Sequence, residues 1–267
     1  MPATNAPEPE FPTRNMKGKI MSEFDCAILG LTHGTQQSPI DILSQQAFRA
    51  VLPAIVFKYP NQINGTFTRN PWDEEHPSFS VSAKTPARIE FGTTHAELKQ
   101  IHFHSPSEHL IDSKSHTAEF HFVHNITGPN KGDKNFLSRE PSTKIVLAVF
   151  FEQAISKELT RENEKEKLDE YSRFIAALAE CRSKSGTGAE VTVPSDLISE
   201  LKKSSNEYFH YRGSLTTGTY AEVVTWLVLP RTVDIPVGLP DAIKDAEQHT
   251  RSIQQINRRT ILHRAAE

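Results

Sequence analysis

Short apolar runs separated by turn residues dominate the hydrophobic pattern of this chain. The runs are rich in Val, Ile and Phe, and clusters of Pro, Gly, Asn and Ser lie between them, which is typical of β-strands. Seven runs are predicted as strands: Ala54–Tyr59, Phe79–Ala83, Arg88–Phe91, Leu98–His104, Ala118–His124, Ile145–Phe151 and Glu222–Leu229. The pattern therefore predicts a protein built on a sheet.

Helical periodicity is confined to a few segments. Apolar residues recur at helical spacing at Leu168, Tyr171, Ile175, Leu178 and Ala179. They predict a helix over Glu164–Cys181, which a run of Ser, Lys, Gly and Thr terminates. Weaker patterns predict shorter helices over Asp196–Lys203 and Asp241–Glu247, and a polar loop over Lys131–Lys144. We expect a mainly β, single-domain protein with a few peripheral helices.

Composition adds limits to this picture. Residues 1–20 are Pro-rich and polar and are predicted to be a disordered tail, whereas residues 21–267 are long enough for one domain with a substantial core. A net charge of -3 gives no reason to expect nucleic acid or an anionic membrane as a partner. No stretch approaches the ~18–20 apolar residues that span a bilayer.

Sequence features that indicate the cellular compartment point in different directions. The amino terminus lacks the apolar segment of a signal peptide, which favours a cytoplasmic protein. Asn64 and Asn125 begin N-glycosylation sequons, which favour secretion. Cys26 and Cys181 are far apart in sequence, and both reduced thiols and one disulfide remain open. We expect cytoplasmic residence.

Histidines provide the strongest chemical signal, because six of the 12 lie between Gln100 and His124. Side chains alternate between the two faces of a strand, so His102 and His104 share a face. In the next predicted strand, His121 lies on the same face as Glu119. Antiparallel pairing of the two strands would bring the three imidazoles together.

Three imidazoles with an open fourth position are typical of catalytic zinc, whereas structural zinc sites usually have four protein ligands. Copper, nickel and iron accept the same donors, so spacing alone does not fix the metal. Gln100 and Glu119 each precede a proposed ligand by two residues, on the same strand face. They are well placed to hold the outer ring nitrogen of a ligand.

Four sequence blocks resemble the alpha-class carbonic anhydrases. These blocks are Gln37–Ile42, Gln100–His109, Ala118–His124 and Tyr211–Trp226, with a weaker fifth, Asn-Arg-Arg, beginning at Asn257. They occur in the order of the family and extend over almost the whole chain after the tail. The resemblance implies a large, twisted, mostly antiparallel central sheet of about ten strands with a conical active-site cavity.

The resemblance also implies an activity, the reversible zinc-dependent hydration of carbon dioxide to bicarbonate and a proton by attack of a zinc-bound hydroxide. The zinc ligands would be His102, His104 and His121. Thr216 would accept the hydroxide proton and pass a hydrogen bond to Glu108. The residues that line the substrate pocket would be Thr217, Val123, Val146, Leu215 and Trp226. The residues that hold the zinc ligands would be Gln100, Glu119 and Asn257.

The chain departs from the family pattern at several positions. Thr66 stands where many members carry a proton-shuttling histidine, and threonine does not titrate near neutral pH, so slow, buffer-dependent turnover is expected. The usual Thr-Thr-Pro-Pro becomes Thr216–Thr219 without prolines, which predicts a less rigid loop. Leu31 and Tyr220 occupy the positions of a disulfide common among relatives, and this paired loss fits a reducing compartment.

Two rival functions remain. One is a carbonic-anhydrase-like binding protein that is catalytically weak or silent, and the other is a zinc esterase, at least as a side activity. The expected ligands are carbon dioxide and bicarbonate, and we expect a monomer or a weak dimer. A carbon dioxide hydration assay with and without zinc chelation separates the proposed enzyme from these two rival functions.

Overall fold

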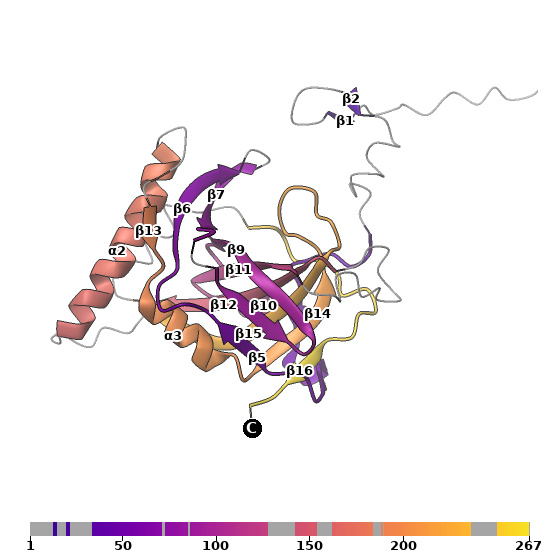
Figure 1. Ribbon diagram of the computed structural model, residues 1–267. Coiled ribbons are helices and arrows are strands. Elements are labelled where there is room, and N and C mark those ends of the chain that lie inside the picture. The colour runs from indigo at the N-terminus through magenta and orange to yellow at the C-terminus, as the bar shows by residue number, and fades with distance from the viewer. Residues whose placement is uncertain are drawn as a thin grey trace, which may run out of the picture.

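A twisted sheet of 12 strands organises the chain (Figure 1). The computed structural model describes residues 13–14, 20–21, 34–70, 73–84, 86–127, 142–153, 162–183, 188, 190–235 and 250–266. The main sheet has the strand order β13-β6-β7-β9-β11-β12-β15-β14-β16-β4, and β5 joins it through β8, which pairs with β9. Most neighbours are antiparallel, whereas β12–β15 and β16–β4 are parallel. The predicted mainly β class and large twisted sheet are confirmed.

The strands of the main sheet are β4 (Phe48–Arg49), β5 (Ile55–Lys58), β6 (Asn64–Asn70), β7 (Asp73–Val81), β8 (Arg88–Phe91), β9 (Thr94–His104), β11 (Ala118–Ile126), β12 (Lys144–Gln153), β13 (Glu190–Thr192), β14 (Tyr208–Gly213), β15 (Val224–Ile235) and β16 (Leu262–Arg264). Two small sheets pair β1 (Thr13–Arg14) with β2 (Ile20–Met21) and β3 (Asp41–Ile42) with β10 (Leu110–Ile111). The helices are η1 (Ser44–Gln46), α2 (Glu162–Ser183) and α3 (Ser195–Ser204).

All seven predicted strands and the two predicted helices within the described residues are present; Arg88–Phe91 has the predicted ends, and the ends of the others are shifted. The polar strand β6 and the aromatic strand β14 were not predicted, because neither shows an uninterrupted apolar run. The predicted loop over Lys131–Lys144 is wrong at its end, since Lys144 begins β12. Residues 142 and 143 precede β12 outside any helix or strand, whereas residues 131–141, the predicted helix over Asp241–Glu247 and Cys26 lie outside the described residues.

The two faces of the sheet have different roles. Phe120 and Phe122 of β11 enter the larger hydrophobic core, together with Ile101 and Phe103 of β9. The residues between them point to the other face, which carries the histidines and a second apolar cluster. Alternation along two neighbouring strands therefore gives the fold its core on one face and its candidate site on the other.

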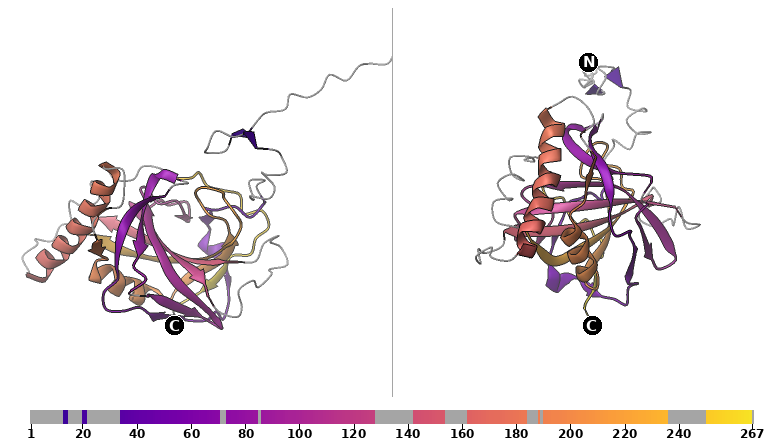
Figure 2. Two further views of the ribbon diagram at one scale, coloured as in Figure 1. Left: turned by 45° about the horizontal axis from the view of Figure 1, so that its top comes forward. Right: turned by 60° about the vertical axis from the view of Figure 1, so that its left-hand side comes forward.

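Helix α2 covers the sheet beside β6 and β13 (Figures 1 and 2). The Phe174 ring lies 4.9 Å from the Phe67 ring and 5.4 Å from the Phe79 ring, measured between centroids. Leu178 and Cys181 of the same helix are buried in the larger core. Among the described residues, no helix combines the length and apolar character needed to cross a membrane.

His124 is a buried histidine on the core face of β11 and serves the fold. Its Nδ1 lies 3.2 Å from the carbonyl oxygen of Ile145, and its Nε2 lies 2.6 Å from the hydroxyl of Tyr59. Because a carbonyl only accepts, Nδ1 carries the proton and Nε2 accepts from Tyr59. Both contacts are satisfied by the neutral ring, and burial lowers the pKa of His124 to about 4.

His124 is therefore expected to make the fold acid-sensitive. The unfolded chain binds this proton below about pH 6.5 and the folded chain only below about pH 4, so acid favours unfolding by about 3 kcal/mol across that window. Urea unfolding at a series of pH values measures this. The variant His124→Gln should lose less stability on acidification than the unsubstituted protein, and parallel profiles for the two would contradict the assignment.

Candidate metal centre

Three histidines from two adjacent strands converge on the face opposite the larger core. In the antiparallel ladder of β9 and β11, His121 lies directly opposite His102, and Glu119 lies opposite His104. The Nδ1 of His121 is 3.2 Å from the Nε2 of His102, and one ring nitrogen from each histidine lies within 4.8 Å of the other two. The convergence predicted from alternation is present, and His104 and His121 are almost fully buried.

The donors fit a zinc ion. His121 directs Nε2 to the carboxylate of Glu119, at 2.8 Å, so its Nδ1 lone pair faces the other two rings. Ring nitrogens that face one another at 3.2 Å need a shared proton or a cation between them. Neutral imidazole nitrogens without a fourth protein ligand are the donor set of catalytic zinc.

Gln100 and Glu119 lie where the sequence places them. The side-chain amide of Gln100 is 3.2 Å from the Nδ1 of His102. Glu119 Oε1 accepts from His121 and lies 2.6 Å from the Nδ1 of His109, while Oε2 accepts from the backbone N–H of His109 at 2.7 Å. These contacts fix which nitrogen of each ring faces inward.

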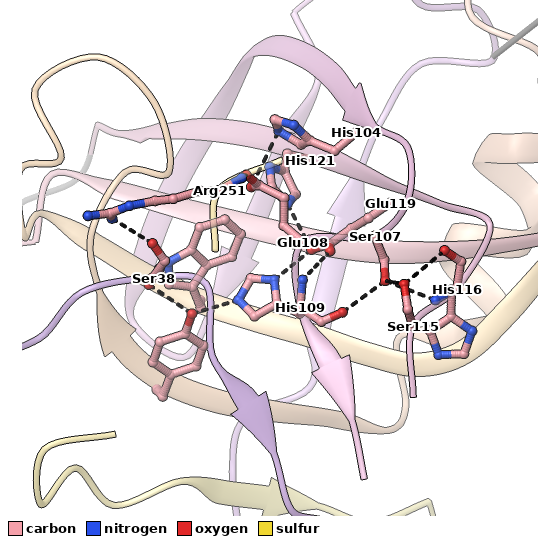
Figure 3. Close-up of polar contacts among 12 residues, drawn as sticks. Ser38, His104, Ser107, Glu108, His109, Ser115, His116, Glu119, His121 and Arg251 are labelled. Atoms are coloured by element: carbon pink, nitrogen blue, oxygen red, sulfur yellow. Dashed lines mark hydrogen bonds and ion pairs between the residues drawn. The ribbon is translucent and has the colours of Figure 1, made fainter. Parts of the chain in front are cut away.

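The fully buried Glu119 stays ionised because of these neighbours. Burial alone would raise the pKa of its carboxyl, but charge interactions and hydrogen bonds with His109 and His121 lower that pKa well below its ordinary value. The atoms of Glu119, His109 and His121 are close enough to suggest a second metal site. Their mutual hydrogen bonds already account for that proximity, so this trio supports the histidine cluster (Figure 3).

The support extends to a distant part of the chain. The Nε2 of His109 lies 2.6 Å from the hydroxyl of Tyr211, which donates to Ser38 Oγ at 2.8 Å. Ser38 Oγ also accepts from the backbone N–H of Ser214 at 3.2 Å. Buried hydrogen bonds thus connect the segment around Ser38 to β14 and β11 (Figure 3), and the Ser214 N–H adds a bond to the loop that follows β14.

Glu108 is buried beside the histidines, and its hydrogen-bond donor is Arg251 rather than the expected Thr216. Its Oε1 accepts from the backbone N–H of Arg251 at 2.9 Å, and its Oε2 lies 3.4 Å from the Nε2 of His104. The buried Thr216 makes no hydrogen bond to Glu108 in the described part of the chain, so the expected bond between them is absent here. Glu108 Oε2 is left without a hydrogen-bond donor at the edge of the histidine cluster.

Arg251 was not identified from the sequence. Its guanidinium lies 3.9 Å from the centroid of the Tyr220 ring and donates to the carbonyl oxygen of Ser38 at 2.7 Å. No local pattern singles it out, because its partners lie 31 or more residues away in sequence. Its backbone and side chain together connect Glu108 to the loop that carries Thr216 and Thr217.

The loop without prolines is a turn that prolines could not form. Gly218 has φ +66° and Tyr220 has φ +53°, and the backbone N–H of Tyr220 donates to the carbonyl of Thr217 at 3.4 Å. Proline is restricted to negative φ, and glycine adopts positive φ without a Cβ penalty. Tyr220 has this uncommon backbone conformation, and its ring lies under the Arg251 guanidinium.

The predicted apolar wall is present next to the histidines. Val123, Val146 and Trp226 occupy one row across β11, β12 and β15, and Leu215 packs against the same cluster. The Trp226 ring lies 4.9 Å from the His121 ring, between centroids, and its Nε1 donates to the carbonyl of Ser214 at 3.1 Å. Thr217 is half-buried at the start of the turn.

Thr66 lies on the same face of the sheet as the histidines, on β6, which is separated from β9 by β7. Register pairs Thr66 with Ser80, and Ser80 with Gln100, so all three side chains share the face of His102. Thr66 is half-buried. A side chain at this position is therefore directed to the side of the sheet on which a shuttle would work.

Asn257 does not lie where the resemblance implied. It is exposed, has φ +50°, and donates through Nδ2 to the carbonyl of Thr35 at 2.8 Å. In the described structure it contacts none of the three histidines. The match of the Asn-Arg-Arg block was too short to fix its alignment, because the Pro and Gln that normally follow it are missing.

The chain is similar to known proteins over most of its length. The family model described as eukaryotic-type carbonic anhydrase matches residues 27–265. Alpha carbonic anhydrase 7 of Arabidopsis thaliana is 28% identical over 236 residues, which cover 85% of this chain and 74% of that protein.

Two solved structures share the fold. Dioscorin complexed with ascorbate has a TM-score of 0.67 at 20% identity and covers 88% of this chain and 87% of its own. The alpha-carbonic anhydrase of Photobacterium profundum has a TM-score of 0.63 at 23% identity and covers 91% of this chain and 98% of its own. At these identities the likeness establishes the architecture alone.

Proposed function

The chain belongs to the eukaryotic-type carbonic anhydrase family, and we propose that it hydrates carbon dioxide reversibly to bicarbonate and a proton with zinc held by His102, His104 and His121. The observation that carries this proposal is the convergence of three imidazole nitrogens within 4.8 Å, beside an apolar wall on the same sheet face. Bound zinc would supply a nucleophile at neutral pH, because it lowers the pKa of a coordinated water to about 7.

The residues of the chain provide the surroundings that this chemistry needs. Glu119 accepts a hydrogen bond from the outer nitrogen of His121 and thereby leaves its inner nitrogen with a lone pair, and the Gln100 amide contacts the outer nitrogen of His102 and holds the orientation of that ring. Val123, Val146 and Trp226 offer an apolar surface for carbon dioxide, which has no charge to recognise.

Glu108 and Thr216 are proposed to orient the reacting oxygen. Glu108 Oε2 is buried and accepts no hydrogen bond from the described residues, which makes it available to a hydroxyl donor at this point. Thr216 is the proposed donor, which would leave the threonine oxygen free to accept a proton from the nucleophile. Arg251 holds the other carboxylate oxygen and so fixes the direction of Oε2.

A binding protein of the same fold is the alternative function. The absent hydrogen bond between Thr216 and Glu108 favours it, because that bond would align the nucleophile. Stopped-flow carbon dioxide hydration separates the two functions when run on zinc-loaded protein and after removal of the metal by a chelator. Activity that disappears on chelation and returns with zinc supports the enzyme, and equal rates at background level support the binding protein.

Proton removal is expected to limit turnover, because Thr66 cannot titrate at the position of a shuttle. Thr66→His should raise kcat at saturating carbon dioxide by roughly tenfold to a hundredfold in weak buffer, with little change in kcat/KM. The measurement is stopped-flow hydration across buffer concentrations.

Imidazole buffer should raise kcat of the unsubstituted protein in the same way and should add little to Thr66→His. Thr68→His is a matched control, since Thr68 lies on the same strand face two residues farther along. If neither the buffer nor Thr66→His changes kcat, proton transfer is not the limiting step, or another group performs it.

A further inference from the structure

Lys144 lies on the sheet face that carries the histidines. His121, Val123 and Asn125 occupy alternate positions of β11 and share this face. Lys144 is the direct cross-strand partner of Asn125 on β12, and directly paired residues of an antiparallel ladder project to one side. The lysine therefore lies two rows beyond His121, with the apolar row of Val123 between them.

Among the described residues, the ammonium group of Lys144 has no counter-charge. Its Nζ donates to Asn125 Oδ1 at 2.8 Å, and in the described part of the chain no carboxylate lies within 4.0 Å of it. The residue is half-buried, and burial lowers the pKa of its ammonium. An ammonium has three N–H donors, and partly buried charges are normally paired.

The nearest carboxylate in the same row is already engaged. Glu97 lies opposite Asn125 on β9, but it is ion-paired with Arg88 at 3.4 Å and with Lys99. The row that runs from Arg88 through Glu97 and Asn125 to Lys144 thus has more cations than anions. The row ends at the positively charged Lys144, two residues from Val146 of the apolar wall.

We infer that Lys144 and Asn125 form a subsite for a small carboxylate-type oxyanion on the histidine face of the sheet. The ammonium supplies charge, and the Asn125 amide, whose oxygen already accepts from Lys144, has N–H groups that donate to no acceptor among the described residues. Bicarbonate, the product of the proposed reaction, has this chemistry. Its identification as the natural ligand rests on the proposed function, whereas the preference for an oxyanion does not.

Equilibrium titration of the zinc-loaded full chain with ¹³C-bicarbonate and with ¹³C-acetate, followed by NMR line broadening, tests the subsite. Lys144→Met is expected to raise the dissociation constant of both anions by about fivefold, the effect of removing one charge near a partly solvated site. Lys144→Arg keeps the charge and should stay within about twofold of the unsubstituted protein. A loss confined to bicarbonate would narrow the ligand class without removing the subsite.

Lys99→Met is the matched control, because Lys99 is an exposed lysine of β9 that already has Glu97 as its partner. The variant Lys99→Met should leave both dissociation constants unchanged. Lys144→Gln provides a second neutral variant, and circular dichroism checks that each variant is folded. Unchanged binding of both anions by folded Lys144→Met and Lys144→Gln would overturn the inference.

The same titration separates this inference from the proposed function. A chain that hydrates carbon dioxide but binds anions independently of Lys144 retains the function and loses the subsite. A chain without hydration activity whose anion affinity depends on Lys144 retains the subsite and loses the enzyme.

Discussion

Replacing His104 with alanine is expected to reduce zinc-dependent carbon dioxide hydration to the uncatalysed background. His104 is fully buried, and it supplies one of the three ring nitrogens that converge within 4.8 Å. Two imidazoles cannot maintain the coordination that lowers the pKa of a metal-bound water. Loss of a direct ligand should weaken zinc binding by more than the ~100-fold upper range seen for residues that only support ligands.

Two measurements separate the possible reasons for lost activity. Competition with a chromophoric chelator gives zinc affinity, and stopped-flow hydration at saturating zinc gives the rate of the loaded protein. His95→Ala is the matched control, because His95 is an exposed histidine of the same strand outside the cluster, and it should retain both. If His104→Ala hydrates carbon dioxide as fast as the unsubstituted protein, the histidine cluster is not the catalytic centre.

The centre of the site was predictable because it depends on alternation within two neighbouring strands. A period of two determines which side chains share a face, so the positions of His102, Gln100 and Glu119 follow once the strands pair in antiparallel register. Burial of Phe120 and Phe122 on the opposite face removes the freedom to shift that register by one residue.

The periphery of the site was less predictable, because it is built by contacts between distant segments. Arg251 reaches Glu108 over 143 residues and Ser38 over 213 residues, and no periodic pattern encodes such a contact. The short Asn-Arg-Arg block placed Asn257 near the ligands, whereas the chain turns there with positive φ and directs the side chain to Thr35. Strand β6 was not predicted because Phe67 is its one large apolar residue and its neighbours in the strand are Gly or polar residues.

The structure explains why the loop at Gly218 lacks the prolines that are usual in the family. Loss of two prolines predicts a looser loop, yet the observed turn requires positive φ, which proline does not allow. The conformation is supported by the Tyr220 ring under Arg251. The shape of this turn therefore depends on a glycine that allows positive φ and on a contact between two distant segments.

Glu119→Gln is expected to weaken zinc binding by about 10- to 100-fold, the range typical of residues that orient a metal ligand. The carboxylate accepts hydrogen bonds from His121 and from the ring and backbone of His109, and an amide can offer an acceptor on one side only. One buried N–H must then face the amide N–H₂, which should also cost about 1–3 kcal/mol of stability.

Glu152→Gln is the matched control for this prediction. Glu152 likewise accepts from a histidine, His116 at 2.7 Å, and from a second donor, Thr117 at 2.8 Å, but neither partner belongs to the histidine cluster. Chelator competition should give an unchanged zinc affinity for Glu152→Gln and a reduced one for Glu119→Gln. Equal zinc affinities for the two variants would mean that Glu119 stabilises the fold without orienting His121, and the inward direction of the His121 Nδ1 would then have to come from backbone register alone.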